Sequence, residues 1–263
     1  MGNERRWNAV ARVVAEAPHG TTVGVAVREL GTGEAWESGG GTVLPAASTI
    51  KLAILVALYR EVDAGRIDLD TEVAVEPGVK VQGSGVLTWM KDGLRIPVRD
   101  VAYLMISISD NTASNMLIDL VGMDRIKGTV ADLGLPNLAL NRRFLGRMPG
   151  PGEPENVTSA ADLADLLVAI WEDRAASGES CAAMRATLKL QQHRDRIPRL
   201  LPDAYVFGGK TGTVGDVAHD AGVIETPKGL LAIGVMTRGF DPVYDADVLM
   251  GRIAKAAVEV VEG

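Results

Sequence analysis

The stretch that decides the fold is residues 45–51, Pro-Ala-Ala-Ser-Thr-Ile-Lys, which leads directly into an apolar segment from Leu52 to Leu58. A proline and two small residues followed by a continuous apolar run predict the start of a buried helix. A lysine in such a helix is costly unless it is paired or put to use. Ser48 and Lys51 share one helical face. The pair marks a candidate site, although an N-cap role for Ser48 or Thr49 would explain the serine in isolation.

Two further short motifs follow, and each lies at a local structural break. Ser109-Asp110-Asn111 stands between two apolar helical segments, 101–108 and 112–121, so capping of the second helix by Asp110 is an equally good interpretation of that residue. Lys210-Thr211-Gly212 follows two glycines in a strand-like segment, where a ligand can approach the backbone closely. A Ser-x-x-Lys pattern alone occurs by chance about once in a chain of this length, but three motifs in this order are far more specific.

Strand signals are concentrated at the two ends of the chain. An amphipathic helix is expected from Glu4 to Ala17, followed by a hairpin of 21–30 and 34–38. Helices dominate from residue 45 to about 202, apart from a possible strand pair near 73–75 and 95–97. We expect one helix to be capped by Ser159 and another to span 180–192. Strands return at 204–208, 221–226 and 230–237, and a last helix spans 247–260.

This order predicts an α+β fold in which an antiparallel sheet is built from both termini and flanked by helices, with an all-helical lobe inserted. Residues 1–45 and 203–263 would form the sheet lobe, and residues 46–202 the helical lobe. The two lobes would make one structural unit, with the site between them.

Composition narrows the functional classes. The chain has 263 residues and a net charge of −7, which argues against a nucleic-acid partner. The single cysteine, Cys181, rules out an internal disulfide and fits a buried apolar position. No apolar run approaches the length of a membrane-spanning helix, and the N-terminus lacks the pattern of a signal peptide. We expect a monomer that is either cytoplasmic or a secreted or periplasmic form whose leader has been removed.

The three motifs together resemble the penicillin-recognising serine hydrolases, most closely the class A β-lactamases. The resemblance extends over nearly the whole chain and implies the two-lobed β-lactamase/transpeptidase fold. From the residues themselves, a partly desolvated Lys51 near a second lysine would have a lowered pKa and could take the proton of Ser48, which would become the nucleophile. The three histidines have no identifiable partners for a Ser-His-Asp triad.

The resemblance assigns roles to the other motif residues. It implies that Ser109 relays a proton to the leaving nitrogen and that Asn111 bonds the substrate amide and the surroundings of Lys51. Lys210 would supply positive potential to Ser109 and the substrate carboxylate, and Thr211 would donate its hydroxyl to that carboxylate. The backbone N–H groups of Ser48 and Thr213 would form the oxyanion hole. No metal and no cofactor are expected.

One departure from the class A pattern concerns hydrolysis of the acyl-enzyme. Class A enzymes carry a glutamate two residues after an arginine in a loop, where it activates the deacylating water. The matching stretch, residues 140–145, places Phe144 or Leu145 at that point. Glu153 and Glu155 follow in a Pro/Gly-rich loop, and we favour their being solvated charges or partners of Arg142 over their folding back into the site.

A second departure concerns substrate binding. His219 falls near the position where many relatives have an arginine that binds the substrate carboxylate. It could bind this group when protonated or as a neutral donor, or it could be a hydrogen-bonded histidine at a strand edge.

The sequence therefore predicts a serine hydrolase that opens β-lactam rings through a Ser48 acyl-enzyme, with deacylation that could be slow. A D-alanyl-D-alanine carboxypeptidase or an esterase on the same site is the first alternative. A penicillin-binding protein or sensor that does not turn over is the second. In each case the partner is a small molecule: a β-lactam, a D-Ala-D-Ala-like peptide or an ester.

Overall fold

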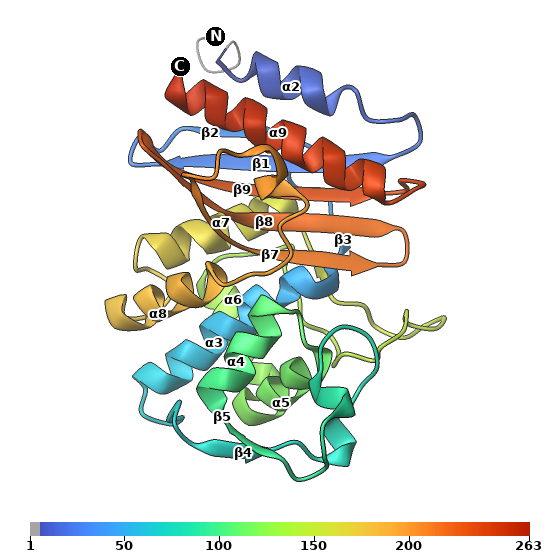
Figure 1. Cartoon of the computed structure of the whole chain (residues 1–263), viewed down its shortest axis with the longest axis vertical. Coiled ribbons are helices and arrows are strands. Elements are labelled where there is room, and N and C mark those ends of the chain that lie inside the picture. Colours follow the sequence, from blue (N-terminus) through green and yellow to red (C-terminus); the bar gives the residue numbers. More distant parts are fainter. Residues whose placement is uncertain (1–5) are drawn as a thin grey trace.

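The computed structural model describes residues 6–263, and its centre is a five-stranded antiparallel sheet of strand order β2-β1-β9-β8-β7 (Figure 1). Strands from the two ends of the chain pair directly, because β1 lies beside β9 over its whole length. The strands are β1 (Thr22–Leu30), β2 (Ala35–Ser38), β7 (Val206–Val214), β8 (Val217–Thr226) and β9 (Gly229–Arg238). This arrangement confirms the predicted α+β fold with a sheet built from both termini.

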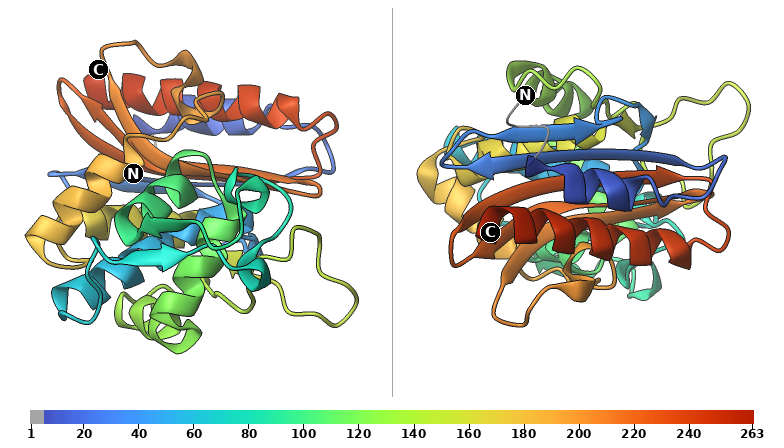
Figure 2. Two further views of the ribbon diagram at one scale, coloured as in Figure 1. Left: turned by 60° about the horizontal axis from the view of Figure 1, so that its bottom comes forward. Right: turned by 90° about the horizontal axis from the view of Figure 1, so that it is seen from above.

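Helices cover both faces of the sheet. Helices α2 (Asn8–Val14) and α9 (Tyr244–Glu262) lie side by side on the outer face (Figure 2). On the other face, α7 (Ala160–Trp171) packs against β1 and β9. The contact is close at Gly234, where an added Cβ would lie 2.5 Å from the carbonyl oxygen of Ala160.

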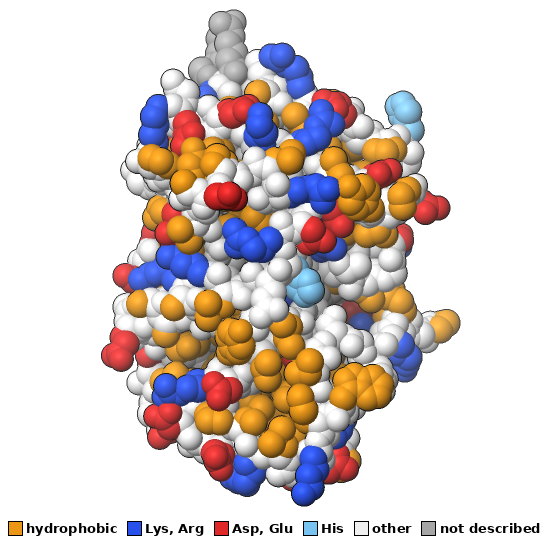
Figure 3. Space-filling model, in the orientation of Figure 1, with side chains coloured by type: hydrophobic (Ala, Val, Ile, Leu, Met, Phe, Trp, Pro, Cys, Tyr) orange, Lys and Arg blue, Asp and Glu red, His pale blue; other side chains and the backbone are white. Residues whose placement is uncertain are grey.

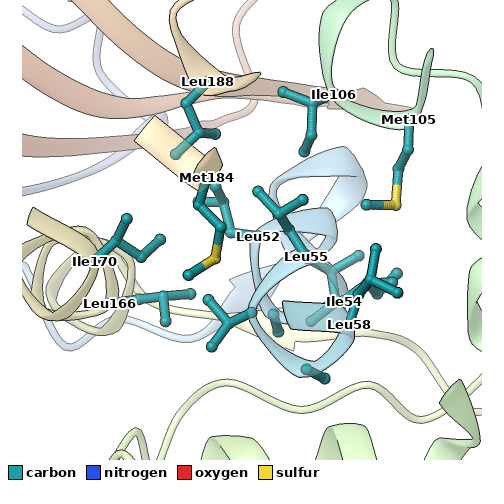
Figure 4. Close-up of a cluster of buried hydrophobic side chains, with 14 of the residues drawn as sticks. Leu52, Ile54, Leu55, Leu58, Met105, Ile106, Leu166, Ile170, Met184 and Leu188 are labelled. Atoms are coloured by element: carbon teal, nitrogen blue, oxygen red, sulfur yellow. The ribbon is translucent and has the colours of Figure 1, made fainter. Parts of the chain in front are cut away.

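The remaining helices build the second part of the molecule around α3 (Lys51–Asp63). Apolar side chains surround α3 on almost every side, which is why its sequence is apolar without a regular stripe. Figure 4 shows Leu52, Ile54, Leu55 and Leu58 of α3 among side chains from the neighbouring helices. The labelled neighbours come from α4 (Val98–Ser107), α7 and α8 (Gly178–Leu188). Helices α5 (Asn111–Val121) and α6 (Met123–Asp132) also pack against α3.

Short elements complete the chain and position the site. Strand β3 (Leu44–Pro45) pairs with β6 (Val157–Thr158), and β4 (Glu72–Ala74) pairs with β5 (Arg95–Pro97), as the sequence predicts for the second pair. Single turns of 3-10 helix occur at η1 (Ala47–Ile50), η2 (Pro77–Val79), η3 (Leu87–Trp89) and η4 (Ile197–Leu200).

Several boundaries differ from the expected ones. The N-terminal helix is shorter than predicted, and its expected start at Glu4 lies outside the described residues. Helix α8 begins earlier than predicted because the Ser177 hydroxyl accepts from the backbone N–H of Ser180, and it ends earlier, at Leu188. Strand β7 continues through all of Lys210-Thr211-Gly212, because every residue from Val206 to Val214 has a partner in β8.

The surface gives two further observations. Figure 3 shows hydrophobic side chains gathered on the helical part of this face, and exposed apolar residues from that part include Val86, Trp89, Met90 and Tyr103. No helix within residues 6–263 is long and apolar enough to cross a membrane.

Candidate active site

Ser48 lies in η1, the single turn that leads into α3. Neither Ser48 nor Thr49 caps α3, and the Thr49 hydroxyl instead donates to the carbonyl of Ala46 at 2.6 Å. Ala47 has a φ of 47°, a strained conformation for a residue with a side chain. The Ser48 hydroxyl makes no hydrogen bond to any described residue, and Ser48 lines a cavity of about 340 Å³. The N-cap interpretation is therefore wrong, and the serine is free for chemistry.

Lys51 is completely buried one turn after Ser48. Its Nζ donates to the backbone carbonyl of Ser109 at 2.7 Å, to Ser109 Oγ at 3.0 Å and to Asn111 Oδ1 at 2.9 Å. The structure thus brings the first two motifs into direct contact. Lys51 Nζ and Ser48 Oγ are not hydrogen bonded in this structure, and catalytic hydrogen bonds often tighten only when substrate binds.

The environment of Lys51 favours its uncharged form. Burial lowers its pKa well below 10.5, the charge of Lys210 lowers it further, and Asp110 opposes both effects. Lys210 is also completely buried, and burial lowers its pKa to about 7, with Asp220 raising it and Arg196 lowering it. Two lysines in one low-dielectric site disfavour each other's charge, which favours the uncharged form of Lys51 Nζ.

Asp110 is a structural residue. Its Oδ1 accepts from the backbone N–H of Ala113 at 2.9 Å and so caps α5. Its Oδ2 accepts from the N–H groups of Val86 and Leu87 at 2.7 and 2.9 Å. The capping interpretation is therefore correct, and this cap holds its neighbour Ser109 at a φ of 60° with the hydroxyl turned toward Lys51.

Strand β7 brings the third motif against the nucleophile. A Cβ added to Gly212 would lie 3.0 Å from the backbone nitrogen of Ser48 and 3.1 Å from that of Thr49, so only glycine fits this approach without a shift. Ser48 and Thr213 line the 340 Å³ cavity together. Lys210 Nζ donates to the carbonyl of Thr211 at 2.9 Å, and it forms no hydrogen bond with Ser109.

Of the two residues expected at the point of the missing glutamate, Phe144 and not Leu145 lies against Lys51. Lys51 Nζ lies 4.5 Å from the centre of the Phe144 ring, whereas Leu145 is exposed. The side chain of the buried Asn115 bonds both backbone polar groups of Phe144. The Phe144 N–H donates to Asn115 Oδ1 at 2.9 Å, and Asn115 Nδ2 donates to the Phe144 carbonyl at 3.1 Å. An apolar ring is thereby held beside Lys51 Nζ.

The two loop glutamates are paired elsewhere. Glu153 accepts from Arg147 and from the backbone N–H of Gly150, which lowers its pKa to about 2. Glu155 lines the large cavity, but its Oε1 accepts from Arg142 at 2.8 Å and from the N–H of Asn156 at 2.7 Å. The partnership with Arg142 that the sequence favours for these glutamates is formed by Glu155.

His219 is not placed to bind a substrate. It is completely buried in β8, an interior strand, with Nε2 2.8 Å from the Pro45 carbonyl. Its Nδ1 lies 2.7 Å from the Ala218 carbonyl and 3.1 Å from the Thr237 nitrogen. Burial lowers its pKa to about 4, so the ring is neutral near pH 7. The substrate-binding role expected for His219 is corrected to a structural role, and the expected edge position is wrong.

Arg196 is the site residue that sequence reasoning missed. It lines a second cavity of about 120 Å³ that also contains Ser48 and Thr211. Its guanidinium donates to Asp247 at 2.7 Å, to Thr213 Oγ1 at 2.6 Å, and to two backbone carbonyls of β7 and β8. Backbone carbonyls leave no trace in a sequence motif, and Asp247 is distant in the chain, so no local signal pointed to Arg196.

Comparison with known proteins agrees with this geometry. The model of the β-lactamase enzyme family matches residues 5–261. The crystal structure of a β-lactamase from Sphaerobacter thermophilus is 41% identical, with a TM-score of 0.93 over 97% of this chain and 98% of that chain. The structure of a PBP-A mutant, an acyl-enzyme complex with penicillin G, is 29% identical, with a TM-score of 0.89 over 98% and 97% of the two chains.

A curated relative, the β-lactamase regulatory protein BlaB of Streptomyces cacaoi, is 26% identical over 94% of this chain and 96% of its own length. The family match spans nearly the whole chain, and the three motifs of the family converge on one cavity. The chain therefore belongs to the β-lactamase enzyme family and is a hydrolase of the β-lactamase type.

Proposed function

We propose that the protein opens β-lactam rings through an ester on Ser48 and releases the product slowly. The observation that carries the proposal is the pair of contacts made by Lys51: hydrogen bonds to Ser109 and Asn111 on one side and the ring of Phe144 on the other. The first set supports acylation. The Phe144 ring, which carries no carboxylate, cannot assist deacylation.

In the acylation step, Ser48 Oγ attacks the lactam carbonyl while its proton passes to Lys51 Nζ. The backbone N–H groups of Ser48 and Thr213 receive the charge that develops on the carbonyl oxygen. The ring C–N bond then breaks, and the nitrogen takes a proton relayed from Lys51 through Ser109 Oγ. The Lys51–Ser109 hydrogen bond of 3.0 Å supports this route.

Deacylation needs a base for water, and the described residues offer few. Phe144 cannot accept a proton, and Glu153 is tied to Arg147. Glu155 has one oxygen, Oε2, without a hydrogen-bond partner among the described residues, so it is the group to test. Without a positioned base, deacylation loses a factor of about 10² to 10⁴.

Stopped-flow kinetics with a chromogenic cephalosporin tests the proposal. We expect a burst close to one equivalent of enzyme followed by a slow phase, with the slow phase unchanged in Glu153→Gln and Glu155→Gln. Fast turnover without a burst that collapses in Glu155→Gln would overturn the slow-release part and make Glu155 the base.

Assays on the same enzyme preparation distinguish the alternative functions. A label that persists on Ser48 without any slow turnover favours a penicillin-binding protein or sensor. Release of D-alanine from a D-Ala-D-Ala peptide, at a rate above that of β-lactam turnover, favours the carboxypeptidase. Lack of reaction with either, together with hydrolysis of a small ester, favours the esterase.

A further inference from the structure

His193 is a titratable residue in the active site that the proposed mechanism does not use. It lines the 120 Å³ cavity together with Ser109, Thr211 and Arg196. The cavity can receive an anion, because the buried Arg196 guanidinium and the hydroxyls of Thr211 and Thr213 line it and the charge of Lys210 acts on His193. One carboxyl, that of Asp195, also lines it. The carboxylate on a β-lactam nucleus is such an anion.

The loop that carries His193 is fixed to the end of α4. Gln192 N–H donates to the carbonyl of Ser107 at 3.0 Å, and Gln191 Nε2 donates to the carbonyl of Ile106 at 3.1 Å. The His193 ring itself faces the carbonyl of Ile108, immediately before Ser109. The imidazole is therefore held at the wall of the cavity, next to the relay serine.

The charges around His193 make its protonation sensitive to a bound anion. Its pKa is lowered from 6.5 by burial and by the cations Lys210 and Arg196, while Asp195 and the Ile108 carbonyl oppose this. Lys210 comes from β7, the other charged groups come from its own loop, and the end of α4 contributes no charge. A carboxylate in the cavity would offset the two cations and favour the protonated ring.

Resting on the proposed function, we infer that His193 is a specificity-determining residue that binds the substrate carboxylate through its protonated ring, so that anionic substrates bind more tightly in mild acid. By linkage, protonation tightens the complex by the same factor by which binding lowers the acid dissociation constant of His193. The pKa of His193 therefore rises by the logarithm of that factor. For a partly exposed charge pair we expect about a two- to fivefold effect.

Nuclear magnetic resonance titration of the three histidines measures this directly. In the Ser48→Ala variant, where the lactam stays intact, saturating benzylpenicillin should raise the His193 pKa by about 0.3 to 0.7 pH units. Its methyl ester, which lacks the charge, should leave the His193 pKa unchanged. His19, which lies outside both active-site cavities, serves as the internal control.

Affinity gives a second readout in the same background. Binding of benzylpenicillin should tighten between pH 7.5 and 5.5 by about two- to fivefold more with His19→Gln than with His193→Gln. An unchanged His193 pKa, or an equal pH dependence in the two variants, would overturn the inference.

Labelling of Ser48 keeps the two proposals apart. In the unaltered enzyme and in His19→Gln, Ser48 should acquire a benzylpenicilloyl group at pH 7.5. Normal labelling with an unchanged His193 pKa rejects the role of His193 alone. No binding and no labelling in any variant rejects the proposed function and the inference together.

Discussion

At the scale of single residues, the proposed mechanism gives different tasks to two buried lysines. Lys51 must lose a proton to act as a base, and its burial and the neighbouring cation lower its pKa. Lys210 must stay charged to attract a carboxylate, and Asp220 raises its pKa against the effect of burial. The charged neighbours of the two lysines therefore differ, and this difference fits a base role for Lys51 and a charge role for Lys210.

Substitution by arginine should reveal this difference. Lys51→Arg should lower the acylation rate by about 10²- to 10⁴-fold, because a guanidinium cannot be deprotonated in a protein. Lys210→Arg keeps the charge and should lose no more than about tenfold, mainly as a higher KM. Single-turnover acylation with benzylpenicillin measures both. Similar, mild losses in the two variants would remove the case for Lys51 as the base.

At the scale of elements, the junction between α4 and α5 positions the relay serine. Asp110 serves three backbone N–H groups from two segments while almost fully buried. Removing it takes away a helix cap and leaves buried donors unpaired.

Asp110→Ala should therefore lower the free energy of unfolding by about 2 to 4 kcal/mol. Asp110→Asn keeps one acceptor oxygen and should lose less. Urea denaturation followed by circular dichroism gives both values. A change below about 0.5 kcal/mol in the alanine variant would show that the three hydrogen bonds contribute little.

In the proposed mechanism, the loop that carries Phe144 limits the rate of product release. Because Asn115 fixes the Phe144 backbone, a carboxylate placed at this residue would lie beside Lys51. Phe144→Glu should raise the deacylation rate by about 10²- to 10⁴-fold. The matched control is Leu145→Glu, which puts the same charge on an exposed neighbour and should leave the rate unchanged. Equal rates in the two variants would show that a base at this position is not what limits release.

At the scale of the whole molecule, the sheet and helix α7 meet along a close seam. Gly234 of β9 allows the start of α7 to lie directly on the sheet. Gly234→Ala should lower the free energy of unfolding by about 1 to 3 kcal/mol, because the new methyl group meets backbone rather than a movable side chain. Gly41→Ala, at a site with open space, is the control. Equal stability of the two variants would show that the seam relaxes at no cost.

Sequence reasoning reached the parts of this molecule that local patterns determine. The hairpin, the returning strands and the Ser159 cap follow from alternation and from residue preference at helix starts, and the structure confirms them. Division of the chain after residues 45 and 202 stays a prediction. Sequence reasoning missed Arg196 and expected a different role for His219, because the contacts of both residues involve backbone carbonyls from segments that are distant in the sequence. The partners of Glu153 and Glu155 depend on how one loop closes.

The most direct test of the central claim is quenched-flow mass spectrometry of the intact protein with benzylpenicillin. We predict that one benzylpenicilloyl adduct per chain forms early, maps to the Ser48 peptide and decays slowly, and that Ser48→Ala shows none. An adduct on Ser109, or full substrate consumption with no accumulated adduct, would contradict the account.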